Sequence, residues 1–224
     1  MLSREKFLKV FLIGGIGVLL LLLAAIILPI KKQSALPPIE SYGQDLAPAD
    51  RERFLTRIKE YEQKAKDNST SADAWLQLGI NQEALGAQAY AINSYKKAAS
   101  INTKSFLPYL NLGNIYVKMG EYSNAEQAYF RALQNDPIKV YLYRPLVELY
   151  EQHLTQKKYK VVELLNAGLK EEPLYENAEL LGMLAVYYKD AGDVANAIPV
   201  YERLVRADPT NDTAKEELAE LKRR

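Results

Sequence analysis

The sequence predicts an all-α protein in which a solenoid of antiparallel helix pairs follows one transmembrane helix. A pattern of aromatic, small and leucine residues recurs at an offset of 34 residues, which is typical of helical repeats. Residues 10–30 form an apolar run of 21 residues without a charge. At a rise of ~1.5 Å per residue this run covers about 30 Å, the thickness of a bilayer core.

The apolar run is flanked by basic residues, three in the N-terminal segment 1–9 and two directly after the run. We favour an uncleaved anchor over a cleaved signal peptide, because the run exceeds the usual ~7–15 apolar residues and no Ala-x-Ala site follows it. The small excess of basic residues before the run favours a cytoplasmic N-terminus. The repeats are then expected outside the cytoplasm, with cytoplasmic placement as the alternative.

Two segments connect the anchor to the repeats. Residues 31–47 contain Pro37, Pro38 and Gly43 and show no helical period, so we interpret them as a linker. Residues 48–71 carry apolar side chains at helical spacing and are predicted to form a capping helix that packs on the first repeat.

The next two segments, residues 72–105 and 106–139, are the clearest repeats. Small residues let two helices approach closely, and bulky residues fill the space beside the crossing point. Gly86 and Gly120 fall at the turn, where a helix end favours left-handed dihedral angles. Each unit is therefore predicted to be a helical hairpin. The matched positions are Trp75, Leu78, Gly79, Gly86, Ala91, Tyr95 and Ala98, followed by Tyr109, Leu112, Gly113, Gly120, Ala125, Tyr129 and Ala132.

Two further units and a cap complete the array. Residues 140–177 start in register, but the turn is lengthened around residues 152–158, so we predict an irregular third unit. Residues 178–211 return to the regular pattern as a fourth unit. Residues 212–224 place apolar residues on one helix face and charged residues on the other, as expected of a C-terminal capping helix.

The pattern resembles the tetratricopeptide repeat family. In the first unit, Thr103 stands at the position of the terminal proline and Gln82 at that of Tyr116. The resemblance implies a right-handed superhelix of about four repeats with capping helices. The pattern is most complete in the second unit, at Tyr109, Leu112, Gly113, Tyr116, Ala125, Tyr129, Ala132 and Pro137.

The resemblance also implies a concave groove, lined by the first helix of each unit, that holds a peptide or helix of another protein. Apolar groove residues beside Arg144 predict an amphipathic partner segment that carries an acidic residue. The competing interpretation is that leucines such as Leu107 and Leu110 only complete the packing. The groove positions given by the repeat spacing are Leu76, Ile80, Glu83, Leu107, Leu110, Asn114, Val117, Tyr141, Arg144, Glu148, Glu151, Glu179, Val186 and Lys189.

Most of the 16 tyrosines are expected to be structural. Eight occupy the packing positions of the repeat, and we interpret them as core residues. Tyr141 lies off these positions. The eight predicted core tyrosines are Tyr95, Tyr109, Tyr116, Tyr129, Tyr143, Tyr150, Tyr188 and Tyr201.

Composition argues against nucleic-acid binding and catalysis. Five of the 29 basic and one of the 28 acidic residues precede Gln33, which leaves a net charge of −3 from there on. That is not the field of a nucleic-acid binder. The chain has no cysteine and no glycine-rich phosphate loop, and its one histidine, His153, is interpreted as a solvated residue of the irregular turn. We therefore predict no enzyme activity, no cofactor and no metal site.

These features predict a membrane-anchored interaction scaffold or adaptor, acting in secretion, envelope assembly or pilus-like assembly. The alternative is a non-catalytic accessory or regulatory subunit of a membrane enzyme complex. In both cases the partner is a protein, the membrane contact is made through residues 10–30, and self-association stays open.

Overall fold

A computed structural model describes residues 35–171 and 176–223. These residues form α-helices joined by short turns, with no strand among them. The helices are α2 (Pro48–Asp67), α3 (Ala72–Ala84), α4 (Gln88–Ile101), α5 (Leu107–Lys118), α6 (Tyr122–Asn135), α7 (Tyr143–Gln152), α8 (Lys160–Gly168), α9 (Ala178–Asp190), α10 (Val194–Ala207) and α11 (Asp212–Leu221), and the 3-10 turns are Ile39–Ser41, Val140–Leu142 and Thr155–Lys157.

The predicted anchor at residues 10–30 and the segment before it lie outside the described residues. None of the helices found in residues 35–171 and 176–223 has both the length and the apolar character needed to cross a bilayer.

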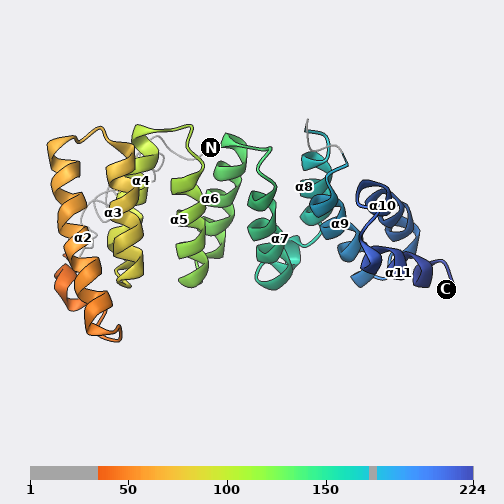
Figure 1. Ribbon diagram of the computed structural model, residues 1–224, viewed down its shortest axis with the longest axis horizontal. Helices are drawn as coiled ribbons and strands as arrows, with labels where there is room; N and C mark the ends of the chain where they lie inside the picture. Colours follow the sequence, from red (N-terminus) through yellow and green to blue (C-terminus); the bar gives the residue numbers. More distant parts are fainter. Residues whose placement is uncertain (1–34, 172–175, 224) are drawn as a thin grey trace, which may run out of the picture. The chain divides into compact units, whose positions relative to one another are not determined.

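Each helix packs mainly against the helices before and after it in the chain (Figure 1). The closest pairings are α3 with α4, α5 with α6, and α9 with α10. Helix α2 packs on α3, and α11 packs on α10. The unit Pro38–Arg224 is therefore an all-helical solenoid, as the 34-residue period predicts.

Glycines end the first helix of three of the four pairs. Gly86, Gly120 and Gly192 have φ of 84°, 73° and 71°, a conformation that costs glycine nothing and other residues more. The residue after each glycine returns a backbone hydrogen bond of 2.8–2.9 Å to the carbonyl five positions earlier, which satisfies the end of the helix. The prediction of left-handed turns at Gly86 and Gly120 is confirmed.

Small residues let the paired helices touch. A Cβ atom placed on Gly79 would lie 2.6 Å from the Tyr95 ring, and one placed on Gly113 would lie 2.3 Å from the Tyr129 ring. Only glycine therefore fits beneath each tyrosine, and the fully buried Tyr95 fills the space beside the crossing.

The third pair exchanges these two roles. Tyr143 is supplied by the first helix, α7, and Gly168 by the second helix, α8, where a Cβ would lie 2.6 Å from the Tyr143 ring. No glycine occurs in the connection between α7 and α8, which instead runs through residues 153–159 and includes the 3-10 turn Thr155–Lys157.

The structure confirms that the eight tyrosines at the packing positions contribute to the core. Tyr95, Tyr129, Tyr143, Tyr150 and Tyr201 are buried. The other three, Tyr109, Tyr116 and Tyr188, are partly buried and pack against the core clusters. Tyr141 is 49% exposed, in agreement with its place outside the packing positions.

Candidate functional site

The first helices α3, α5, α7 and α9 form one continuous surface, which we call the first-helix face. An ion pair of 2.7 Å joins Glu83 of α3 to Lys118 of α5. A small pocket lies between α5 and α7, where Val117 and Glu148 are both lining residues. An ion pair of 2.9 Å joins Arg144 of α7 to Glu179 of α9. The repeat spacing therefore brings the predicted groove helices next to one another.

Four predicted groove residues are apolar and exposed. Ile80 is 38% exposed, Leu107 42%, Tyr141 49% and Val186 46%. Tyr141 makes an edge-on contact with the ring of Phe106, with 6.0 Å between the centroids. Exposed apolar side chains on one surface are typical of a contact site for another protein.

Three other apolar residues of the predicted groove are partly buried. Leu76 packs against the core cluster around Tyr95, and Leu110 and Val117 pack against the larger cluster that extends to α11. For these residues the competing interpretation, completion of the packing, is supported by the contacts. The two leucines singled out from sequence therefore differ, because Leu107 is exposed and Leu110 is partly buried.

Several polar members are held by hydrogen bonds within the chain. Glu83 accepts a hydrogen bond of 2.8 Å from the Tyr95 hydroxyl, besides its ion pair. The side-chain oxygen of Asn114 accepts one of 2.8 Å from the Tyr129 hydroxyl. Lys189 pairs with Glu217 of α11 at 2.9 Å. These groups tie neighbouring helices together and are less free to bind a partner.

Arg144 also has a partner within the chain. Its guanidinium donates to the Glu179 carboxylate at 2.9 Å. From the sequence alone, Arg144 is expected to be unpaired and to bind an acidic residue of the partner. Glu179 therefore balances this charge in the free protein, and the acidic partner segment stays a prediction from the sequence.

Glu148 and Glu151 are the two polar members whose carboxylates have no hydrogen-bond or ion-pair partner within the described chain. Burial and the charge of Glu148 raise the pKa of the Tyr129 hydroxyl to about 12. Burial and the charge of Glu151 likewise raise the pKa of Tyr187. Both carboxylates therefore impose a negative potential on this part of the first-helix face.

A pocket of about 540 Å³ lies between α7 and α9. We call it the α7–α9 pocket. It is an open hollow on the surface rather than an enclosed cavity. Five of the predicted groove residues line it. Its lining consists of Arg144, Val147, Glu148, Glu151, Gln152, Glu179, Gly182, Met183 and Val186.

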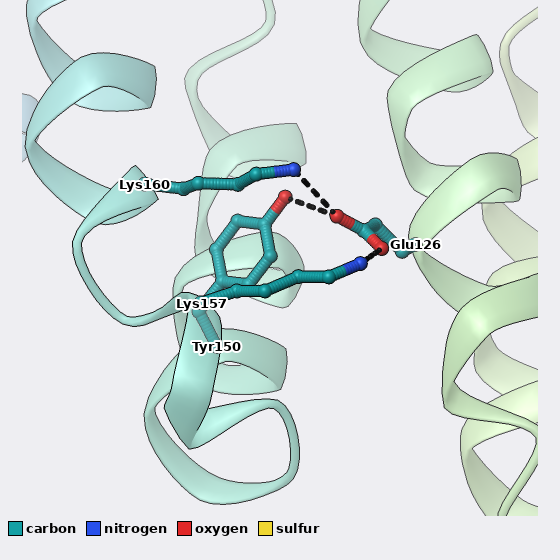
Figure 2. A network of polar contacts seen from close by, with 4 residues as sticks. All are labelled: Glu126, Tyr150, Lys157 and Lys160. Atoms are coloured by element: carbon teal, nitrogen blue, oxygen red, sulfur yellow. Dashed lines mark hydrogen bonds and ion pairs between the residues drawn. The ribbon is translucent and has the colours of Figure 1, made fainter.

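A second polar arrangement holds the irregular third unit to α6 (Figure 2). The buried Glu126 carboxylate accepts hydrogen bonds from the Tyr150 hydroxyl at 2.9 Å, from Lys157 at 2.5 Å and from Lys160 at 3.2 Å. Burial by itself raises the pKa of Glu126, but these three donors outweigh it and hold that pKa below the ordinary value. The network fixes the position of the turn at residues 153–159.

His153 belongs to this turn. It is exposed, as expected for a loop residue, and its ring stacks on Tyr122 with 4.3 Å between centroids. Within residues 35–171 and 176–223, no cluster of three or more histidine, aspartate or glutamate side chains is arranged to hold a metal ion.

Comparison with known proteins identifies the repeats. Residues 107–138 and residues 178–221 each match a family model described as tetratricopeptide repeat. These two segments are tetratricopeptide repeats. The human tetratricopeptide repeat protein 6 is 34% identical over 74 residues, which make up 33% of this chain. The chain spans 14% of the length of that relative.

Several solved structures have a similar fold. A crystal structure of MamA has a TM-score of 0.54 at 20% identity and covers 70% of this chain and 89% of its own. A TPR protein from Parabacteroides merdae has a TM-score of 0.54 at 18% identity, covering 77% and 67%. YrrB, a TPR protein with an unusual peptide-binding site, has a TM-score of 0.50 at 15% identity, covering 72% and 81%. At these identities the likeness shows the fold alone.

The TPR register locates one pocket residue that the sequence prediction left out. Gly182 occupies the position of Leu76, Leu110 and Arg144 in the last repeat. A Cβ atom placed on Gly182 would meet nothing within 4 Å, so the surface of α9 is open at this point.

Proposed function

We propose that this protein is a protein–protein interaction scaffold whose first-helix face binds a peptide or helix of a partner. The observation that supports this most strongly is the α7–α9 pocket, which combines exposed Val186, open Gly182 and two unpartnered carboxylates. Unpaired charges and exposed apolar groups contribute little to the stability of the free chain, whereas both recognise a partner. The peptide-binding site of YrrB shows that a protein with this fold can hold a peptide.

The proposal includes a membrane anchor at residues 10–30. Its support is the length and uncharged character of the run and the basic residues on both sides of it. The linker at residues 31–47 reaches at most ~60 Å when fully extended. The scaffold then acts close to the bilayer, outside the cytoplasm, in secretion, envelope assembly or pilus-like assembly, and without catalysing a reaction itself.

Photo-crosslinking in intact cells tests the surface. A photoreactive residue at Val186 is expected to trap one discrete protein, because this side chain lines the α7–α9 pocket. The matched control is the same residue at Tyr159, which is 66% exposed but does not line the pocket. Equal trapping from both positions, or only lipid and self-crosslinks from Val186, would contradict the assignment. A trapped membrane enzyme would identify the chain as an accessory subunit.

Fractionation tests the anchor separately. The full-length protein is expected to stay with membranes after alkaline carbonate extraction, and a variant lacking residues 1–32 is expected in the soluble fraction. Protease added to intact cells is expected to cleave the repeats. Release of the full-length protein by carbonate would contradict the anchor, and protection of the repeats from protease would reverse the orientation.

A further inference from the structure

We propose that the α7–α9 pocket selects a basic amphipathic segment of the partner. An apolar side chain of that segment enters beside Gly182 and Val186, and a neighbouring lysine or arginine pairs with Glu148 and Glu151. This inference rests on the proposed function and specifies the chemistry of the partner, which the sequence had predicted with the opposite charge.

The pocket has a net negative charge. Its charged lining residues are Arg144, Glu148, Glu151 and Glu179, one positive and three negative, so its formal charge is −2. The single cation is already bound to Glu179. An incoming anion would therefore compete with Glu179 for Arg144, whereas an incoming cation meets two carboxylates without a hydrogen-bond or ion-pair partner in the described chain.

Two of the acidic residues lie close together on one helix. Glu148 and Glu151 are three residues apart on α7, where side chains share one helix face. Like charges at this spacing destabilise a helix modestly. A cation supplied by a partner removes the repulsion and gains two charge-assisted contacts.

The chain's own cations nearby are committed elsewhere. Lys189, on α9, pairs with Glu217, and Lys157, after α7, pairs with Glu126. Lys158 lies over the Tyr187 ring, 5.6 Å from its centroid. The negative charge of the pocket is therefore balanced neither by its lining nor by these three lysines.

Part of the pocket lining is apolar. Val147, Met183 and Val186 surround the open surface at Gly182. An aliphatic side chain fills such a space, and the aliphatic stem of lysine or arginine can lie along it while the charged end reaches the carboxylates. The pocket therefore recognises the combination of an apolar residue and a cation.

Matched peptides test the charge preference. Pairs of amphipathic peptides share their apolar residues and carry lysine in one member and glutamate in the other. Binding to the full-length protein in detergent is followed by fluorescence anisotropy. We expect the lysine members to bind about tenfold more tightly, and the difference to shrink as salt is added.

The double variant Glu148→Gln, Glu151→Gln is expected to remove this preference without lowering the melting temperature, because it also removes a repulsion. The matched control is Glu163→Gln, Glu171→Gln, two exposed glutamates of α8 and the residues after it that lie outside the pocket, and it is expected to keep the preference. If Glu148 and Glu151 are only solvated surface charges, the two double variants should show the same preference between the lysine and glutamate peptides.

Several results would overturn the proposal. These are equal binding of the two peptide members, tighter binding of the glutamate members, no binding of either, or a preference that survives the change at Glu148 and Glu151. Dimers of the protein alone that this change dissociates would make a second copy the occupant instead. If the peptide test fails but Val186 still crosslinks to a protein in cells, the scaffold function is supported and only the proposal of a basic partner segment is wrong. If Val186 crosslinks to no protein, the scaffold function and the proposal of a basic partner segment are both wrong.

Discussion

Glycine has two different roles in the first helices. Gly113 of α5 lies beneath the Tyr129 ring, and an added Cβ would come within 2.3 Å of it. Gly182 of α9 faces the α7–α9 pocket, and an added Cβ would meet no atom within 4 Å. The first glycine is required by packing, whereas the second leaves space that the fold does not need.

We therefore expect Gly113→Ala and Gly182→Ala to change stability in opposite directions. Gly113→Ala should destabilise the protein by about 1–3 kcal/mol, because a rigid ring must move. Gly182→Ala should stabilise it by about 0.5–1 kcal/mol, because alanine is the better helix former at an open site. Urea unfolding of both variants measures this, and equal destabilisation would show that Gly182 is also a packing residue.

The connection between α7 and α8 is longer than the other turns between paired helices and is attached to α6. Lys157 of this connection and Lys160, the first residue of α8, pair with Glu126 of α6, so the lengthened turn is attached to the preceding repeat rather than free in solvent. In Figure 2 the donors approach the Glu126 carboxylate from the side of the third unit. A buried charge is tolerated there because three donors satisfy it.

Glu126→Gln is expected to lower the free energy of unfolding by about 1–3 kcal/mol near neutral pH, because two lysines and a hydroxyl lose a charged acceptor. The pKa of Glu126 is lowered in the folded protein. Its contribution is therefore present above the unfolded pKa and is lost as pH falls through the folded pKa. Urea unfolding of both proteins as a function of pH should converge in acid. A constant difference would contradict the role of the charge.

The sequence predicted individual elements better than contacts between them. Gly86, Gly120 and the buried tyrosines followed from the 34-residue period, because each depends on a helix end or on one helix crossing. The pairing of Arg144 with Glu179 did not follow, because it depends on the distance between two first helices 35 residues apart in the chain. For the same reason the unpaired state of Glu148 could not be predicted.

At the scale of the whole molecule, packing is almost one-dimensional, since each helix contacts mainly its neighbours in the chain. Stability in such arrays is close to a sum of local and nearest-neighbour contributions. Damage at one end should therefore stay near that end. The fully buried Ile58 of α2 packs with Leu78 and Leu85 at the N-terminal end of the array.

Ile58→Ala is expected to destabilise its region by about 2–5 kcal/mol, because a buried side chain is replaced by a cavity. Amide hydrogen exchange should quicken in α2, α3 and α4 and stay unchanged in α9, α10 and α11. Uniform acceleration along the array would instead indicate that all helices unfold as one cooperative unit.

The proposed function requires that the α7–α9 pocket binds a partner and is not simply an unfilled space between two helices. Gly182→Leu adds a side chain to this pocket at a position where an added Cβ meets no atom within 4 Å. The most direct test is the yield of the crosslinked protein from Val186 in cells that carry Gly182→Leu, with the melting temperature of the same variant measured in parallel. We expect the crosslink to disappear while the melting temperature is unchanged or raised. A crosslink that persists at the unsubstituted yield in a folded variant would contradict the account.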